Sequence, residues 1–222
     1  MPESVSTDLG KELRNEVLSK YDIDNYKTDQ INLFTKELNF EKDVKGYVIK
    51  SRQFNAFATP GKYIFVYSGV FDKLNSYEEL ASLLSHEYTH IDKNHGLRSV
   101  GRSLGYEIFT SVFFSDNLKE QIFDNSNMLI NLEYSRAFEK EADLNAFNLL
   151  QKVNIDVNGM FSLLKIMRKI EPRRISNSEL SDHPSTIERI EYIEEAIEKT
   201  ENNSVKNYKL EALFNKIKNS HD

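Results

Sequence analysis

The pentapeptide His86-Glu87-Tyr88-Thr89-His90 constrains the fold of this chain more than any other feature. The apolar residues around it recur at helical spacing: Leu80, Leu83, Leu84, Tyr88 and Ile91. On a helix, residues four apart share a face, so His86 and His90 can direct ring nitrogens at one point. Two imidazoles at this spacing suit Zn²⁺, with Glu87 placed beside the metal's water. The alternative interpretation is a pair of solvated surface histidines.

The flanking sequence predicts where this helix begins and ends. Ser76, followed three residues later by Glu79, forms a capping box. Gly96 follows the last expected turn, where a left-handed C-terminal cap is often needed. We therefore expect a helix over Tyr77–His95, with the site along the border of an apolar stripe.

A catalytic zinc site needs a third protein ligand and one open position. The metzincin pattern requires glycine at position 93 and histidine at position 96, but the chain has Lys93 and Gly96. That class is excluded. His95 is one residue short of the metzincin position, which favours a helix-end histidine near the C-terminal dipole over a ligand.

A carboxylate from a later helix is the remaining common solution. Glu139 and Asp143 are four apart and share a helix face. Glu139 can ligate the metal, and Asp143 can accept the second N–H of a ligating histidine. A charged, solvated helix face is the alternative.

Four motifs occur in one order along the chain: Asn55–Gly69, Glu79–His90, Ser135–Asp143 and His183-Pro184 with Arg189-Ile190. With them the chain resembles the gluzincin metallopeptidases that include HtpX, the type-I CAAX prenyl protease, the Oma-type protease and BepA. The resemblance covers about residues 45–195. It implies one Zn²⁺ per chain and assigns the third ligand to Glu139 instead of Glu141. Lys62 departs from the family, which usually has a second glycine after Pro-Gly.

We expect an α+β fold: a mostly helical, zincin-like domain with a small β-sheet and hairpin beside the H-E-x-x-H helix. Thr59-Pro60-Gly61 predicts a type II turn joining two extended runs. Residues 1–222 are predicted to form one metallopeptidase domain with a catalytic core at about 45–195. The N-terminal helices at 7–38 and the C-terminal helix at 205–218 are predicted to be peripheral.

Composition limits which classes of partner and which cellular locations we expect for the chain. The net charge is −6 with no dense basic patch, which argues against nucleic acid. Cysteine is absent, so histidines and carboxylates must hold the metal. No apolar run is long enough for a transmembrane segment. The run 108–114 favours helix packing over a membrane-surface patch, which is the alternative. The resemblance to short exported relatives implies an extracytoplasmic location, periplasmic or membrane-anchored, with a signal or anchor absent from this chain.

The predicted activity is zinc-dependent endopeptidase action on a protein or peptide substrate, with Glu87 as the base that activates water. His183 is the candidate oxyanion donor. An inhibitory fourth zinc ligand and a helix cap are its alternatives. By resemblance, Asn55, Ala56 and Phe57 border the cleft and bind substrate by β-addition, with plain sheet core as the alternative. The competing function is a zinc-holding, chaperone-like or interaction module with little or self-inhibited turnover.

Overall fold

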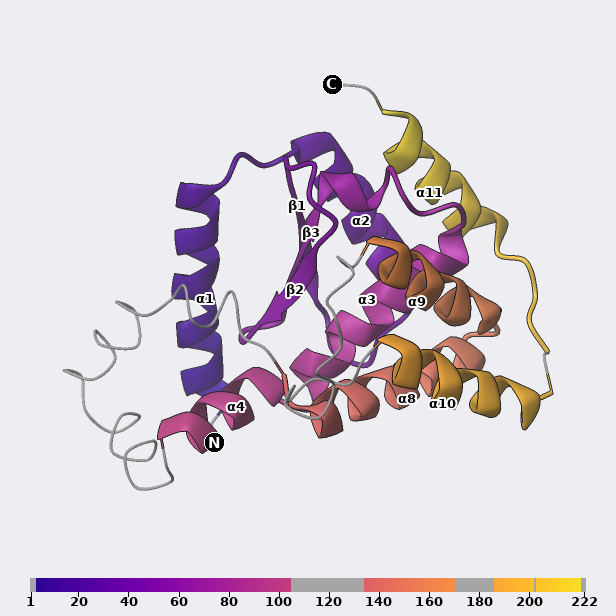
Figure 1. Ribbon diagram of the computed structural model, residues 1–222. Coiled ribbons are helices and arrows are strands. Elements are labelled where there is room, and N and C mark those ends of the chain that lie inside the picture. The colour runs from indigo at the N-terminus through magenta and orange to yellow at the C-terminus, as the bar shows by residue number, and fades with distance from the viewer. Residues whose placement is uncertain (1–2, 105–133, 171–185, 202, 221–222) are drawn as a thin grey trace.

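The computed structural model describes residues 3–104, 134–170, 186–201 and 203–220. Figure 1 shows these elements around a small central sheet. In chain order they are α1 (Glu3–Lys20), α2 (Asn25–Glu37), β1 (Lys45–Ile49), β2 (Ala56–Thr59), β3 (Tyr63–Tyr67), a 3-10 turn (Ser68–Val70), α3 (Tyr77–Asp92), α4 (His95–Leu104), α8 (Arg136–Lys152), α9 (Asn158–Ile170), α10 (Thr186–Glu198) and α11 (Tyr208–Asn219). The predicted α+β class, mostly helical with a small sheet, is confirmed.

The sheet has the strand order β1-β3-β2. β1 runs parallel to β3, whereas β2 and β3 form the predicted antiparallel hairpin. Gly61 has a φ of 81°, as the third residue of a type II turn requires. Lys62 follows with a φ of 71°, so the family's usual glycine would fit this left-handed position without the steric cost.

Helices cover both faces of this sheet. On one face, Val17 of α1 packs with Tyr47, Phe65 and Tyr67 in a separate apolar cluster. The opposite face joins the main core beneath α2 and α3 (Figure 1). α1 crosses the hairpin turn closely, because a Cβ on Gly10 would lie only 2.2 Å from a backbone oxygen of the turn.

α3 is the central helix, and it ends earlier than predicted. Ser76 caps its start by accepting a hydrogen bond from the Glu79 N–H, as the capping box predicted. The helix stops at Asp92 because Asn94 takes the left-handed conformation with a φ of 53°. Gly96 lies inside α4 and is not the cap. Asparagine tolerates this conformation better than most residues, so it can end a helix as glycine does.

Burial around α3 is nearly complete, instead of being confined to a stripe. Every residue from Glu79 to Ile91 is buried, including His86 and His90. α3 packs against α8, α9 and β2, which together enclose it. His86, Glu87 and His90 therefore lie on a helix that is buried on every side over this stretch, and not at the border of one apolar stripe.

α2 and α11 also differ from the expectation that they are peripheral. The predicted 7–38 segment divides at residues 21–24, and Asp24 caps α2 by accepting a hydrogen bond from Lys27 N–H at 2.9 Å. α2 and α11 pack against each other. Both contribute fully buried side chains to the main core, among them Phe34 and Ile217.

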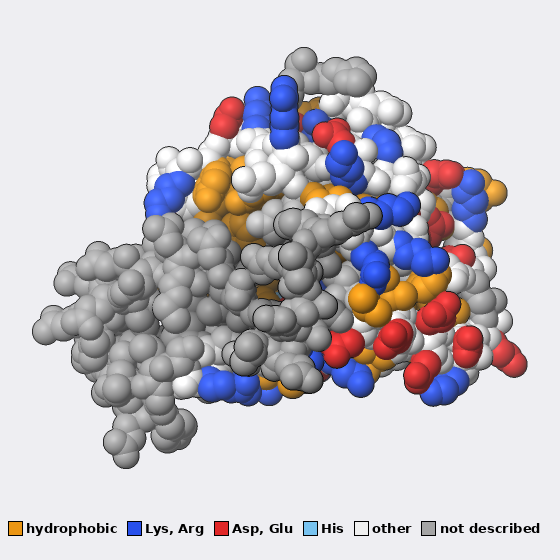
Figure 2. All heavy atoms as spheres, viewed as in Figure 1, with side chains coloured by type: hydrophobic (Ala, Val, Ile, Leu, Met, Phe, Trp, Pro, Cys, Tyr) orange, Lys and Arg blue, Asp and Glu red, His pale blue; other side chains and the backbone are white. Residues whose placement is uncertain are grey.

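The surface seen in Figure 2 mixes acidic and basic side chains over the face that carries α9 and α10. Among the described helices, none combines the length and the apolar character needed to cross a bilayer. The run 108–114 falls outside the described residues.

Candidate metal centre

Two helices bring the three predicted metal ligands together. His86 and His90 project from adjacent turns of α3, with 3.1 Å between their Nε2 atoms. Glu139, in the first turn of α8, places Oε2 at 3.6 Å from His86 Nε2 and Oε1 at 3.6 Å from His90 Nε2. The packing of α3 against α8 thus brings together candidate ligands that lie about fifty residues apart in the sequence.

The spacing of these atoms fits a tetrahedral zinc ion. Ligand bonds of about 2.0–2.1 Å at tetrahedral angles put neighbouring donor atoms about 3.3 Å apart. The three measured separations, 3.1, 3.6 and 3.6 Å, lie on either side of that value. Two imidazoles and one carboxylate also form a donor set typical of catalytic zinc, with a fourth position left for water or substrate. Within the described part of the chain, no other group of three His, Cys, Asp or Glu side chains lies close enough together to hold a metal ion.

Asp143 holds His86 in the orientation a ligand needs. Its Oδ1 lies 2.8 Å from His86 Nδ1, which leaves Nε2 of His86 directed at the metal position. Asp143 is thus in contact with His86, which is one of the two candidate histidine ligands.

Arg189 of α10 completes this network, and no pattern in the sequence predicted this role for it. Its Nε and Nη2 each donate to Asp143 at 2.8 Å, and Nη1 lies 3.2 Å from Glu139 Oε2. Tyr192 donates a further hydrogen bond to Asp143. Burial alone would raise the pKa of Asp143, but the Arg189 guanidinium and the His86 contact hold that pKa well below its usual range. Asp143 is therefore ionised although it is fully buried.

His90 has a different set of partners. Its Nδ1 lies 3.0 Å from Nδ1 of His95, and the Tyr134 ring stacks on it with centroids 3.9 Å apart. His95 Nε2 lies 3.1 Å from Glu141 Oε2. His95 and Glu141 thus contact each other and are not part of the candidate ligand group. Burial lowers the pKa of both His90 and His95, which keeps both imidazoles neutral.

His95 thus departs from its sequence-based interpretation. It begins α4, instead of ending the preceding helix, and its side chain is completely buried against Phe138. The turn at Asn94 redirects the chain so that His95 folds back on His90. No helical pattern in the sequence signals this contact, because it depends on where α3 stops.

Glu87 lines a cavity of about 470 Å³, and the three candidate ligands line the same cavity. Burial, with a smaller contribution from the Glu139 carboxylate, raises the pKa of Glu87 to about 7. A carboxyl group with a pKa near neutrality can both accept and return a proton, which suits a general base that later acts as an acid.

The edge strand β2 forms another wall of this cavity. Asn55, Ala56 and Phe57, predicted to border the cleft, all line it. Asn55 O accepts a hydrogen bond from Tyr67 N–H, so by antiparallel alternation the main-chain groups of Ala56 point away from β3. No other described strand pairs with that edge.

Another wall is apolar and comes largely from α9, which no motif in the sequence placed at the site. Its members are Leu83 of α3 and Met160, Leu163, Leu164 and Met167 of α9. Their helical spacing predicts a buried face but does not show which cavity that face borders. His183, the predicted oxyanion donor, lies outside the described residues.

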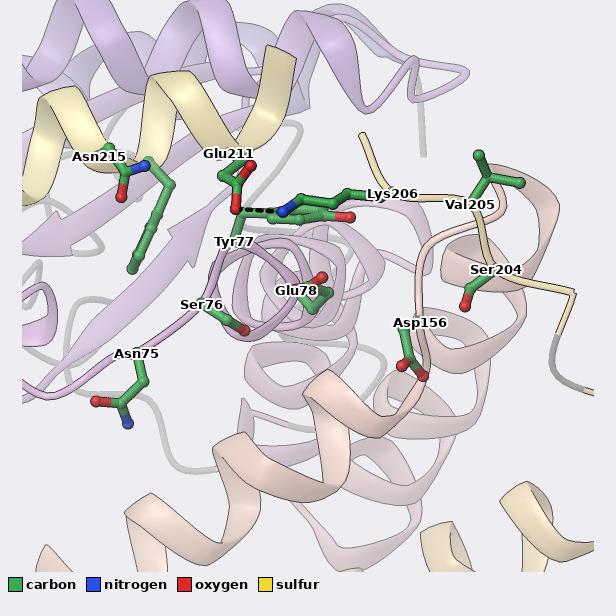
Figure 3. A pocket seen from close by; sticks show the side chains of 11 residues that line it. Asn75, Ser76, Tyr77, Glu78, Asp156, Ser204, Val205, Lys206, Glu211 and Asn215 are labelled. Atoms are coloured by element: carbon green, nitrogen blue, oxygen red, sulfur yellow. Dashed lines mark ion pairs between the residues drawn. The ribbon is translucent and has the colours of Figure 1, made fainter. Parts of the chain in front are cut away.

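A second pocket, of about 320 Å³, lies at the other end of α3 and is shown in Figure 3. Ser76, Tyr77 and Glu78 line it, and Lys206 pairs with Glu211 across it at 2.9 Å. Ten residues of helix rise by about 15 Å, so this pocket is well separated from His86 along α3.

Comparison with known proteins agrees with the geometry. The family model described as Peptidase family M48 matches residues 27–197, which include every ligand candidate. The metalloprotease YcaL of Escherichia coli is 31% identical over 151 residues, covering 64% of this chain and 58% of that protein. The mitochondrial metalloendopeptidase OMA1 of Schizosaccharomyces pombe is 30% identical over 156 residues, covering 67% and 45%. A putative beta-barrel assembly-enhancing protease of Vibrio cholerae is 31% identical over 126 residues, covering 51% and 26%.

These relatives are longer than the aligned region. The chain spans less than six tenths of the length of the YcaL protein that it matches. α1 and α11 lie outside the residues that the family model matches.

Proposed function

Because the chain belongs to peptidase family M48, we propose that it is a zinc-dependent endopeptidase that hydrolyses peptide bonds in protein substrates. The observation that carries this proposal is the convergence of His86, His90 and Glu139 on one point beside Glu87. The matched relatives whose printed names describe them as metalloproteases or metalloendopeptidases support the same activity. Zinc held by these three residues would supply Lewis-acid polarisation of the scissile carbonyl.

Side chains of the protein carry out the proton transfers and hold the candidate ligands in position. Glu87, which is not a ligand, takes a proton from the attacking water and delivers it to the leaving amine. Its buried position raises its pKa and so matches it to both transfers. Asp143 and Arg189 hold His86 and Glu139 in place throughout.

An extended peptide fits the edge of β2 that no described strand covers. Main-chain groups of Ala56 would pair with the substrate, while Asn55 and Phe57 flank it. The apolar wall from α9 would then receive a hydrophobic side chain of the substrate next to the scissile bond.

We further propose a role in envelope protein quality control. The resemblance to exported relatives supports this role, and so does the printed name of the Vibrio cholerae relative, a putative beta-barrel assembly-enhancing protease. The competing function, a zinc-holding binder with little turnover, does not account for Glu87, since binding alone needs no buried proton acceptor.

The decisive test uses unfolded casein, incubated with the zinc-loaded chain with and without chelator. We expect cleavage that the chelator abolishes. Glu87→Gln keeps the shape of the side chain but removes the base, so cleavage should fall by at least about 10²–10⁴-fold while one zinc equivalent is retained. Near-normal cleavage by this variant would contradict the mechanism. A zinc-loaded wild type that never cleaves would favour the binder.

Ligand identity is tested by metal analysis. Glu139→Ala should lose most of its zinc, whereas Glu141→Ala should still bind about one equivalent at saturating zinc. Full occupancy in Glu139→Ala would transfer the ligand role to another carboxylate.

His183 is tested by His183→Ala. An oxyanion donor predicts a fall in kcat of about a hundredfold or more with zinc retained. An inhibitory fourth ligand predicts weaker zinc binding with equal or higher activity. A helix cap predicts a stability loss of about 1 kcal/mol with little kinetic change.

A further inference from the structure

The two metal-directed histidines are secured in different ways. His86 contacts a carboxylate directly, through Asp143, whereas His90 contacts a second imidazole, that of His95. Another histidine is an unusual neighbour for a ligand, because a neutral imidazole accepts a hydrogen bond at only one of its two nitrogens. His95 can therefore accept a hydrogen bond from His90 only if the tautomer of His95 is itself fixed.

The structure supplies a group that fixes this tautomer. The Glu141 carboxylate can only accept, so the contact of 3.1 Å from His95 Nε2 requires a proton on that nitrogen. Nδ1 of His95 is then the unprotonated acceptor. Arg98, whose Nη1 lies 3.4 Å from the same carboxylate oxygen, favours the ionised form of Glu141.

The tautomer of His90 follows from this arrangement. With Nδ1 of His95 accepting, Nδ1 of His90 must donate across the 3.0 Å contact. A neutral imidazole with its proton on Nδ1 has its lone pair on Nε2, and Nε2 is the atom 3.1 Å from His86 Nε2 at the metal position. Packing holds the geometry, since His95 is fully buried and stacked on Phe138 at a centroid distance of 4.4 Å.

We propose that His95 is a positioning residue for zinc binding, and that with Glu141 it fixes His90 in the tautomer that presents Nε2 to the metal. The proposal rests on the proposed zinc site and adds a component to it. It assigns His95 neither a metal bond nor contact with substrate. The chain of contacts runs from His90 through His95 to Glu141, at the protein surface.

The first test needs neither zinc nor activity. In the metal-free chain with ¹⁵N-labelled histidine, long-range ¹H–¹⁵N correlation spectra report which ring nitrogen carries the proton. We expect His90 protonated at Nδ1 and His95 protonated at Nε2. His95→Leu should leave His90 as a mixture of tautomers, whereas His95→Asn, whose side-chain oxygen can accept in place of Nδ1, should restore the Nδ1-protonated form.

The second test measures zinc affinity by competition with a chelator. His95→Leu should weaken zinc binding by about 10- to 100-fold, the usual effect of removing a partner that orients a ligand. His95→Asn should recover part of that loss. Leu97→Ala is the matched control, because it removes a buried side chain from the same helix without touching these hydrogen bonds. It should lower the melting temperature and leave the zinc affinity unchanged.

Unchanged His90 tautomer and zinc affinity in His95→Leu would overturn the proposal. Should that variant not fold, Glu141→Ala replaces it, since a side chain 37% exposed tolerates truncation. There we expect His95 to become a mixture of tautomers, and an unaltered His95 would equally overturn the idea. A wild type that binds zinc but never cleaves casein would defeat the proposed function alone, because the tautomer spectra are independent of it.

Discussion

The two histidines of the proposed metal centre are held by opposite means. On what we call the buried side, Asp143, Arg189 and Tyr192 hold His86 through charges enclosed in the core. On what we call the rim side, His95, Glu141 and Arg98 hold His90 through a neutral ring that ends at partly exposed charges. Asp143 has 0% side-chain exposure, compared with 37% for Glu141 and 49% for Arg98.

This difference in burial separates two roles that a metal ligand's partner can have. Breaking a buried ion pair leaves an uncompensated charge in the core, so the buried side should support folding as well as zinc binding. Exposed pairs contribute little to stability, so the rim side should affect zinc binding far more than folding. Four measurements test this contrast.

The largest effect is expected at the centre of the buried side. Asp143→Asn removes the charge that compensates Arg189, so the free energy of unfolding of the zinc-free chain should fall by about 3–5 kcal/mol. Zinc affinity should fall by about 10- to 100-fold in addition. Urea unfolding in chelator measures the first quantity. A loss below about 1 kcal/mol would show that the buried network does not stabilise the fold.

Lowering the pH should remove much of the stability that the ionised Asp143 contributes to the wild type. The pKa of Asp143 is lower in the folded chain than its ordinary value of 3.8. The stability from its ionised form is therefore complete above that value and is lost as the pH falls toward the lower folded pKa. The difference in unfolding free energy between wild type and Asp143→Asn should shrink below about pH 4. A constant difference from pH 7 to pH 3 would contradict this sign.

A smaller effect is expected from Arg189→Lys, which keeps the charge but cannot reach Asp143 and Glu139 with a planar fork. Losing one charged hydrogen bond should cost about 1.5–3 kcal/mol in zinc-free unfolding. Arg136→Lys is the matched control, because Arg136 pairs with Glu188 at the surface. Its cost should stay within about 0.5 kcal/mol. Equal losses in both variants would remove the distinction between buried and exposed arginines.

The smallest stability effect belongs to the rim side. Glu141→Ala should cost no more than about 1 kcal/mol, and added salt should reduce even that, since screening acts on exposed charges. Its zinc affinity should nevertheless fall measurably. Thermal unfolding of the zinc-free variant at low and high salt, beside a chelator competition, gives both quantities. A stability loss as large as that of Asp143→Asn would show that the two sides are equivalent.

Sequence alone determined the parts of this centre that are local. His86 and His90 share a face because a helix repeats every 3.6 residues, and Glu139 and Asp143 follow the same rule. The hairpin follows from Pro60-Gly61, which favours the turn that the structure contains. These features depend on residues within one helical turn or one hairpin, so their spacing is sufficient to predict them.

Tertiary structure decided what surrounds those residues. Arg189 reaches Asp143 from a different helix, 46 positions along the chain, and no spacing encodes that approach. His95 turns back on His90 because Asn94, and not Gly96, adopts the left-handed conformation. Hydrophobic periodicity shows that a helix face is buried but not which partner covers it. Which residues become neighbours depends on how α3, α4, α8 and α10 pack. That packing is set by the free energy of the whole core.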